Sequence, residues 1–342
     1  MPRGRRPAVY SRGCPPRASL PMTEVRTATI LVNPAARGVA RRFDAARAVG
    51  QLETRGVAVR LEVPGSPGEA IAAARAAAGR GDDLCFVVGG DGTLRLAAEG
   101  LAGSATALAA IPAGTVNIWA REAGIPREVP AAIDAHLAGQ TAAMDLGRAD
   151  GHAFLLMAGI GWDAEIAAGV NPRLKRAAGD IAYILNALVH LPALRTHPAR
   201  WRADGRAFRE PLAWMVLGNT RLYGGRVHLT PGARVDDGRL DMVAFCPHGP
   251  GETLAMAVRV LAGRREGRHV VTGRYAEVAV ETPGLPVQLD GDTVGATPMT
   301  FRVEPGALRV RVPAGPLPAL WGGSPGGDAA PHTPPFSGRG VG

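Results

Sequence analysis

Glycine and aspartate stand together at a point where phosphate chemistry is expected. Gly89-Gly90-Asp91-Gly92-Thr93 follows the apolar residues 84–88 and precedes residues 94–101, which have helical character. Glycines between a strand and a helix permit positive φ, bring backbone N–H groups close to phosphate oxygens and add the positive end of the helix dipole. Asp91 is expected to orient Mg²⁺ or its waters, since a lone carboxylate repels phosphate. A tight turn with an aspartate cap is the alternative.

A second loop of the same kind follows along the chain. Residues 112–117 again come after an apolar run and before a helical segment, and Thr115 and Asn117 offer a hydroxyl and an amide. Residues 33–38 form a turn after the first apolar run. Ligands of open α/β sheets bind at the carboxyl ends of the strands, so these loops are expected to form one nucleotide crevice. Helix capping is the alternative role of Thr115 and Asn117.

Two Asp-Gly motifs in the second half of the chain have residue types suited to metal binding and proton transfer. Residues 234–239 contain Asp236-Asp237-Gly238, and residues 289–292 contain Asp290-Gly291-Asp292. Taken alone, each is most simply a hairpin turn, because Asp-Gly is a common turn sequence.

The elements that must position these loops fall into two parts. Residues 27–141 alternate short apolar runs with helical spacing, which predicts a parallel sheet covered by helices. Beyond them, short strands separated by Asp-Gly turns predict a mostly antiparallel second lobe. We expect a nucleotide-binding lobe at residues 24–144 and a β-rich lobe at 145–313, with the return of its last strands to the first lobe as an alternative. Residues 1–23 are expected to be a disordered arm or a mis-annotated start, and residues 314–342 a disordered tail.

Composition excludes several classes of function. Of the formal net charge of +9, more than half comes from five arginines in residues 1–21, and the remainder shows no basic run with interleaved aromatics, so no nucleic-acid partner is expected. The only lysine, Lys175, follows no glycine-rich segment, which excludes a Walker-type phosphate loop. Three distant cysteines indicate neither a disulfide framework nor a metal site. No apolar run reaches the roughly 18 residues of a membrane span.

These motifs, taken in their order along the chain, resemble the diacylglycerol kinase catalytic-domain family, which includes bacterial lipid kinases and sphingosine kinases. The matching segments are residues 32–34, 89–93, 112–117, 120–121, 158–164, 219, 224–225, 231–241 and 288–292. The resemblance implies a phosphofructokinase-like α/β nucleotide lobe and a mostly antiparallel β-sandwich, with lipid entering between them. It implies transfer of the γ-phosphoryl group of ATP to a hydroxyl of diacylglycerol or a related lipid presented at a membrane surface.

The resemblance also assigns roles to residues. The catalytic residues it implies are Asp292 as general base, Asp290 to orient it, and Asp91. The Mg²⁺ ligands it implies are the Asp237 carboxylate and the backbone carbonyls of Arg234 and Arg239. The nucleotide contacts it implies are Asn33, Pro34, Ala35, Ala36, Arg37, Gly90, Asp91, Gly92, Thr93, Leu94, Thr115 and Asn117.

Departures from the family pattern keep two alternatives open. Arg95 and Leu96 stand where Asn-Glu is usual, and Asp292 replaces glutamate, so a non-catalytic lipid- or nucleotide-binding protein on the same scaffold is one alternative. NAD kinase is the other, because its nucleotide lobe is similar, although the Asn-Glu pair that it expects is missing here. The expected location is the cytoplasm, with peripheral contact at the inner membrane face, and a homodimer is left open.

Overall fold

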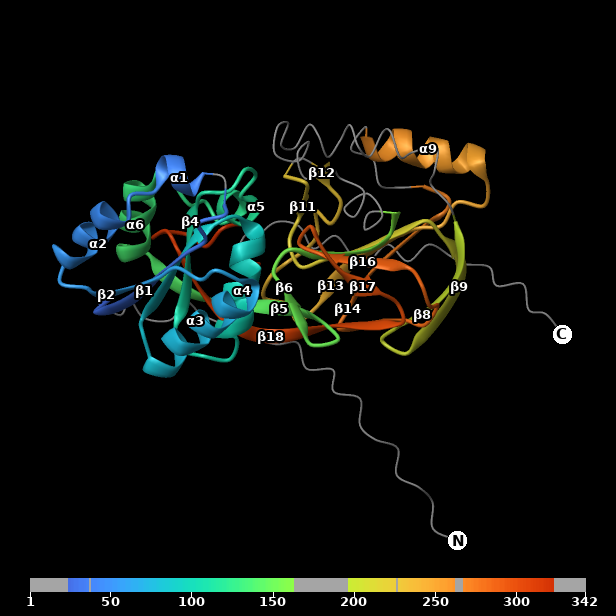
Figure 1. The fold of residues 1–342 in the computed structure, drawn as a ribbon. Helices are drawn as coiled ribbons and strands as arrows, with labels where there is room; N and C mark the ends of the chain where they lie inside the picture. Colours follow the sequence, from blue (N-terminus) through green and yellow to red (C-terminus); the bar gives the residue numbers. More distant parts are fainter. Residues whose placement is uncertain (1–23, 37, 163–195, 226, 262–266, 323–342) are drawn as a thin grey trace, which may run out of the picture.

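Two lobes lie side by side in the computed structural model, which describes residues 24–36, 38–162, 196–225, 227–261 and 267–322 (Figure 1). The first lobe alternates strands and helices, as predicted. Its elements are β1 (Thr27–Val32), α1 (Val39–Arg42), α2 (Ala45–Glu53), β2 (Ala58–Glu62), α3 (Pro67–Arg80), β3 (Leu84–Gly89), α4 (Asp91–Leu101), β4 (Ala107–Pro112), α5 (Ile118–Glu122) and α6 (Val129–Leu137).

Four parallel strands in the order β2-β1-β3-β4 form the centre of this lobe. Every residue of β3 and β4 is buried, which explains why both segments read as continuous apolar runs.

The helix between β2 and β3 has a clear capping residue at each end. Ser66 caps α3 by accepting a hydrogen bond from Glu69 N at 3.2 Å, and Gly81 ends the helix with φ of 73°.

The second lobe is a sandwich of mostly antiparallel strands. Its elements are β5 (Gln140–Ala149), β6 (His152–Phe154), β7 (Met157–Gly161), β8 (His197–Ala203), β9 (Arg206–Leu212), β10 (Trp214–Gly218), β11 (Leu222–Tyr223), β12 (Val227–His228), β13 (Leu240–Phe245), α9 (Pro250–Leu261), β14 (Val270–Tyr275), β15 (Glu277–Val280), β16 (Pro286–Leu289), β17 (Asp292–Ala296) and β18 (Met299–Val312). The sheet β14-β13-β10-β7-β16-β17 packs on β18, β15 and β8, and side chains of both layers, including Trp201, Met215 and Phe301, share one core. The predicted fold class is confirmed.

Asp-Gly pairs form hairpin turns at three places in this lobe. Asp150-Gly151, Asp204-Gly205 and Asp290-Gly291 connect β5 to β6, β8 to β9 and β16 to β17. Both residues of each pair have positive φ, between 43° and 98°. A two-residue turn of this conformation matches the twist of the flanking strands, which accounts for the turn signals in the sequence.

One strand, β18, belongs to both lobes. Its first residues pair with β15 in the sandwich, most of its 14 residues pair with β5, and Val310 near its end pairs in parallel with Leu108 of β4. Within the described residues, the parallel sheet and one layer of the sandwich therefore form a single ten-stranded sheet.

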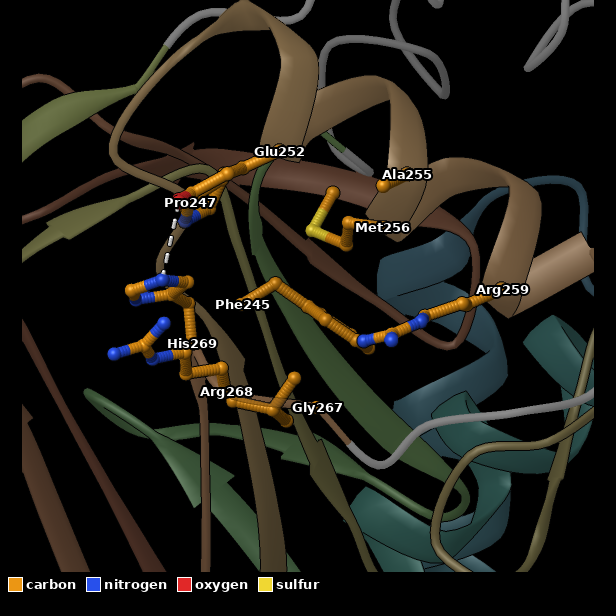
Figure 2. Close-up of a pocket in the computed structure, with 10 residues that line it drawn as sticks. Phe245, Pro247, Glu252, Ala255, Met256, Arg259, Gly267, Arg268 and His269 are labelled. Atoms are coloured by element: carbon orange, nitrogen blue, oxygen red, sulfur yellow. Dashed lines mark ion pairs between the residues drawn. The ribbon is translucent and has the colours of Figure 1, made fainter.

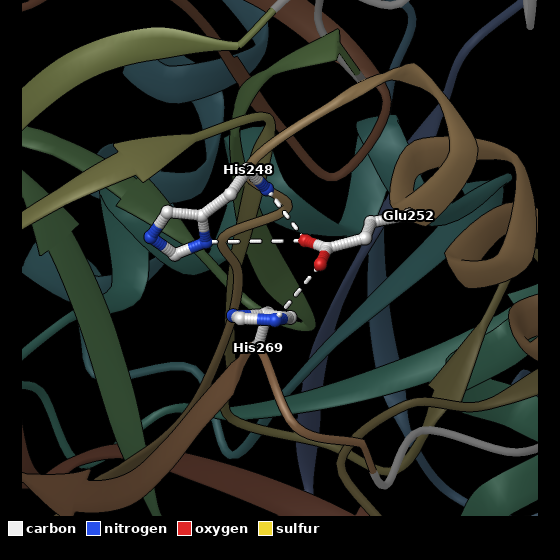
Figure 3. A group of neighbouring side chains, drawn as sticks. All are labelled: His248, Glu252 and His269. Carbon is white, nitrogen blue, oxygen red and sulfur yellow. Dashed lines mark hydrogen bonds and ion pairs between the residues drawn. The ribbon is translucent and has the colours of Figure 1, made fainter.

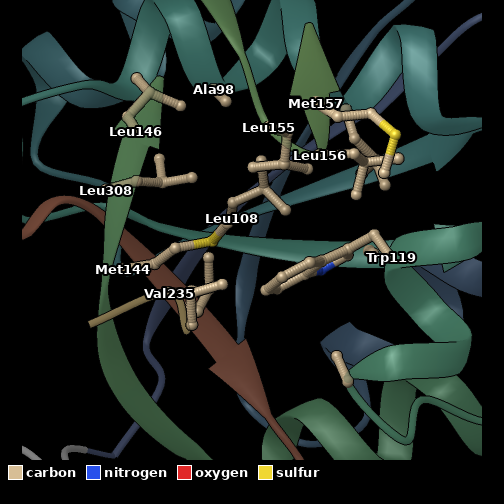
Figure 4. Packing of buried hydrophobic residues seen from close by; sticks show 14 of the residues in the cluster. Ala98, Leu108, Trp119, Met144, Leu146, Leu155, Leu156, Met157, Val235 and Leu308 are labelled. Carbon is tan, nitrogen blue, oxygen red and sulfur yellow. The ribbon is translucent and has the colours of Figure 1, made fainter. Parts of the chain in front are cut away.

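An apolar cluster fills the junction of the lobes (Figure 4). It joins Leu108 of β4, Trp119 of α5, Met144 of β5, Met157 of β7 and Leu308 of β18, all of which are at most 4% exposed. Complete burial of one such side chain stabilises a fold by about 1.5–3 kcal/mol. The relative position of the two lobes is therefore set by packing as well as by the shared sheet.

The predicted disorder of residues 314–342 is wrong for residues 314–322. Trp321 is 3% exposed, its indole Nε1 donates to Ala143 O at 2.9 Å, and its ring packs edge-to-face on Trp119 at 6.0 Å between centroids. The Pro- and Gly-rich composition of this segment gave no sign of its two buried apolar side chains, Leu320 and Trp321. The predicted arm 1–23 and the remainder of the tail lie outside the described residues.

No helix in the described part of the chain is long and apolar enough to cross a membrane.

Candidate active site

The glycine loop turns directly from β3 into α4. Gly90 precedes the helix with φ of −104° and ψ of −175°, an extended conformation that any residue adopts. The expectation that these glycines take positive φ is therefore wrong. Space is the reason for one of them, because a Cβ on Gly89 would lie 2.5 Å from Thr93 Oγ1, whereas a Cβ on Gly90 would make an ordinary contact of 3.4 Å with the Cα of Gly114.

The three loops predicted to converge lie together at the carboxyl ends of β1, β3 and β4. Gly114 approaches Gly90 so closely that a Cβ on Gly114 would lie 2.6 Å from the Cα of Gly90. Gly38 N donates to Ala113 O at 2.9 Å. Asn33 Nδ2 donates to Thr93 Oγ1 at 2.9 Å, which ties the end of β1 to the first turn of α4.

The residues predicted to contact nucleotide differ in how the structure places them. Asn33 accepts from Ala35 N at 3.0 Å and shapes its own turn, in which Pro34 and Ala35 are exposed. Thr115 is exposed as well, whereas Leu94 belongs to the core and is 3% exposed. Arg37 lies outside the described residues.

Asp91 and Asn117 stabilise the loop after β4 by hydrogen bonds to its backbone. The Asp91 carboxylate accepts from Ile118 N at 2.9 Å and from Trp119 N at 3.1 Å, so it ties the N-terminus of α4 to that of α5. Asn117 is 7% exposed, and its side-chain amide exchanges two hydrogen bonds of 2.9 Å with the backbone of Gly114. Asn117 thus folds the loop instead of capping α5 with its side chain. The Mg²⁺-orienting role of Asp91 stays a prediction.

The hairpin β16–β17 brings the second lobe to the glycine loop. Arg95 Nη2 on α4 donates to Asp292 Oδ2 at 3.2 Å, and a Cβ on Gly92 would lie 3.3 Å from the same oxygen. The Asp292 side chain is 53% exposed, while that of Arg95 is 9% exposed. A solvent-accessible carboxylate therefore lies over the first turn of α4, the segment that the sequence predicts to bind phosphate.

Asp290 holds this hairpin in place. Its carboxylate accepts three backbone hydrogen bonds, from Leu155 N at 2.7 Å and from Leu156 N and Met157 N at 2.9 Å each. Burial raises the pKa of Asp290 to about 6, although these hydrogen bonds and Arg95 act in the opposite direction. Asp290 anchors the turn that carries Asp292 to the segment between β6 and β7.

The loop predicted to hold Mg²⁺ is supported by an aspartate that sequence reasoning missed. Asp145, on β5, is 2% exposed, and its two carboxylate oxygens accept from Gly238 N at 2.6 Å and from Gly306 N at 2.7 Å. Burial raises its pKa to about 6, and the negative charges of Asp236 and Asp237 add to the rise. A charged residue inside an apolar strand was the available signal.

The oxygen atoms at and around Asp237 are of the kind that binds a hard divalent cation. Arg239 N donates to Asp237 Oδ1 at 3.1 Å, and Arg274 Nη1 is 3.9 Å from Oδ2. Burial raises the pKa of Asp237, while the hydrogen bond from Arg239 N and the charges of Arg274 and Arg234 act in the opposite direction. Carboxylate and carbonyl oxygens are ligands that Mg²⁺ accepts, and Asp237 with the carbonyls of Arg234 and Arg239 would hold it.

Asn219 links this loop to the Asp290 hairpin. Its side-chain Nδ2 donates to Asp145 O at 2.9 Å and to Leu155 O at 3.0 Å. Leu155 N in turn donates to Asp290. The predicted metal loop and the hairpin carrying Asp292 are therefore joined by continuous hydrogen bonds.

Helix α5 connects the crevice to the second lobe. Arg121 Nη1 donates to Gly225 O at 2.7 Å, and Glu122 Oε1 accepts from Arg221 N at 3.2 Å. Burial raises the pKa of Glu122.

Comparison with known proteins agrees with both lobes. The family described as "Diacylglycerol kinase catalytic domain" matches residues 27–149, and the "YegS C-terminal NAD kinase beta sandwich-like domain" matches residues 157–312. A Mycobacterium tuberculosis (strain H37Rv) protein named "Diacylglycerol kinase" is 35% identical over 300 residues, covering 85% of this chain and 96% of that protein. This chain belongs to the diacylglycerol kinase family. The family membership predicted from the sequence is confirmed.

Other members of the diacylglycerol kinase family extend the likeness. A Pseudomonas aeruginosa (strain PAO1) protein named "Probable lipid kinase YegS-like" is 39% identical over 232 residues, which are 66% of this chain and 76% of that protein. A crystal structure of a diacylglycerol kinase from Bacillus anthracis shares the fold, with a TM-score of 0.65 and 21% identity over 85% of this chain and 98% of that chain.

The structure shows what the residues that depart from the family pattern contact. Arg95 pairs with Asp292, so the basic residue on α4 and the shorter acid on the hairpin compensate each other in charge. Leu96 is partly buried and packs on the apolar cluster of the junction. Both departures are thus compatible with an intact crevice.

Proposed function

We propose that this kinase-family protein transfers the γ-phosphoryl group of ATP to a lipid hydroxyl. The observation that carries the proposal is the Asp292 carboxylate, 3.2 Å from the buried Arg95 and in contact range of Gly92 at the start of α4. A carboxylate at this point can receive a proton from an acceptor hydroxyl while backbone N–H groups of the glycine loop hold the phosphates.

Asp292, Arg95 and Asp290 have different roles in the proposed step. The lipid hydroxyl oxygen forms a bond to the γ-phosphorus, the bond to the β–γ bridging oxygen breaks, and Asp292 receives the hydroxyl proton; ADP and the phosphorylated lipid are released. Arg95 holds the carboxylate and adds positive charge beside the phosphates, and Asp290 fixes the turn. Bound Mg²⁺ supplies charge neutralisation.

Phosphoryl transfer from labelled ATP tests the proposal directly. The purified chain is incubated with Mg²⁺ and mixed micelles containing diacylglycerol, phosphatidylglycerol or a sphingoid base, and with NAD in a parallel reaction. Labelled phospholipid is the expected product. Label in NAD alone would instead indicate an NAD kinase, and lipid binding without transfer to any acceptor would indicate a non-catalytic protein.

Gly90→Val is expected to weaken ATP binding at least about tenfold, a loss of about 1.4 kcal/mol in binding free energy. The extended backbone accepts valine and the nearest atom to the new Cβ is at 3.4 Å, so the fold survives while the branch enters the crevice. Calorimetric titration with ATP measures the loss. Gly68→Val, at the N-terminus of α3 with open space around it, is the matched control. Unchanged affinity in Gly90→Val would place the nucleotide elsewhere.

Asp237→Asn is expected to reduce the stabilisation of the protein by Mg²⁺. A ligand at 100 times its Kd stabilises the folded state by about 2.7 kcal/mol, and removal of the carboxylate charge lowers that gain. Thermal melting with and without Mg²⁺ gives the comparison. Asp150→Asn, in the turn between β5 and β6, should keep the full Mg²⁺ effect; an equal Mg²⁺ effect in both variants would remove Asp237 from the metal site.

A further inference from the structure

Two histidines and a glutamate meet at one corner of the second lobe (Figure 3). His248 follows β13, Glu252 lies in the first turn of α9, and His269 immediately precedes β14. Within the described residues, one ligand atom from each of the three side chains lies within 4.8 Å of the other two. His269 Nε2 is 3.2 Å from Glu252 Oε1, and His248 Nδ1 is 3.9 Å from Glu252 Oε2.

The backbone fixes this arrangement. β13 and β14 are antiparallel neighbours, and Cys246 N donates to His269 O at 2.8 Å just beyond their last paired residues. Glu252 Oε2 accepts from His248 N at 2.8 Å, which holds the carboxylate back against the loop before α9. The three side chains therefore come from segments that are tied to one another by main-chain hydrogen bonds.

We propose that His248, Glu252 and His269 bind a divalent transition-metal ion of the zinc class. Two imidazole nitrogens and one carboxylate oxygen form a ligand set that suits Zn²⁺ and is unlike the oxygen-only set that Mg²⁺ prefers. Ligands at about 2.0–2.2 Å from a tetrahedral Zn²⁺ are roughly 3.3 Å apart, so small side-chain rotations of exposed residues bring the present atoms to that separation.

A second carboxylate lies near the cluster. Glu210 Oε2 is 3.9 Å from His248 Nε2, the ring nitrogen that faces away from Glu252. This distance is too long for a hydrogen bond, so Glu210 contributes negative charge beside the ring without orienting it.

A surface pocket of about 220 Å³ opens beside the cluster (Figure 2). Phe245 and Met256 line its apolar part, and Arg259 and Arg268 its basic part. Glu252 and His269 belong to the same lining. Three protein ligands leave the fourth position of a tetrahedral ion for water, which this pocket can supply. The proposed ion would join β13, α9 and β14 and is independent of the crevice at the glycine loop.

Titration of the full chain with Co²⁺ and Zn²⁺ tests the site. One Co²⁺ per chain with the visible absorption of tetrahedral coordination is expected, with displacement by Zn²⁺ and none by equal Mg²⁺. His248→Ala and His269→Ala should each weaken Zn²⁺ binding by at least about tenfold, whereas His152→Ala, an exposed histidine on β6, should leave it unchanged.

Melting curves without metal distinguish loss of ligands from loss of fold. Because His248 is half exposed and His269 is 31% exposed at the side chain, both variants should melt at the wild-type temperature when no metal is added. Zn²⁺ affinity that is equal in the wild type and both variants, binding weakened equally by His152→Ala, or full competition by Mg²⁺ would each overturn the proposal.

Discussion

Asp292→Asn is expected to lower kcat by about 10²–10⁴ with little change in ATP affinity. Asparagine keeps the shape of the side chain but cannot receive the proton of the lipid hydroxyl. The Asp292 side chain is 53% exposed, so its replacement should leave the melting temperature near that of the wild type. Steady-state kinetics with lipid micelles, together with thermal melting, give both readouts.

Two further variants decide what a loss of rate means. Asp292→Glu restores the residue common in the family and should retain substantial activity if the hairpin accepts one more methylene. Asp134→Asn is a matched control, because Asp134 is also half exposed and pairs with an arginine, Arg55, at 2.8 Å outside the crevice. Turnover near that of the wild type in Asp292→Asn would remove this residue from the chemistry.

A chain that ends at residue 313 is expected to melt far below one that ends at 322. The shorter chain lacks Trp321, and loss of a buried tryptophan costs about 3–5 kcal/mol. At about 2–4 °C per kcal/mol for a protein of 150–250 residues, the midpoint should fall by on the order of 10 °C. Differential scanning calorimetry measures the fall.

The chain ending at 322 is the control, since it removes only the residues beyond the packed segment. Trp321→Phe in the full chain isolates the indole: it removes the hydrogen bond to Ala143 O but keeps an aromatic ring against Trp119. We expect an intermediate midpoint. Equal melting of the 313 and 322 chains would mean that this contact contributes nothing to stability.

Elements with strong local signals were predictable from the sequence. The buried strands β3 and β4 read as apolar runs, and the Asp-Gly turns specify hairpins because few other residues accept positive φ at both positions. The loops that follow β1, β3 and β4 were predictable as one crevice because parallel strands present their carboxyl ends at the same edge of a sheet.

Contacts that depend on distant segments were not predictable. The ion pair of Arg95 with Asp292 joins two lobes, and neither residue's neighbours in sequence indicate the other. Gly114 leaves no space for a side chain beside Gly90, because a Cβ on Gly114 would lie 2.6 Å from the Cα of Gly90, and only the packed loops reveal this contact. The burial of Leu320 and Trp321 was not predictable, because two adjacent apolar residues in a Pro- and Gly-rich segment have no periodicity to detect.

The proximity of His248 and His269 was not predictable from the sequence either. His248 lies in the loop before α9, so its distance of four residues from Glu252 is no helical spacing, and the two side chains meet because the loop turns back onto the first turn of the helix. The third ligand could be found only from the pairing of β13 with β14, which brings the segment before β14 beside the one after β13.

The shared strand β18 constrains the order of events during synthesis on the ribosome. Val310 pairs with Leu108 of β4, so the parallel sheet of the first lobe keeps an open edge until residue 310 has emerged. Domains usually fold as units from the N-terminus onward, and unpaired strand edges invite aggregation while they wait. Nascent chains of this protein should therefore depend on chaperone protection at β4 until the last strand arrives.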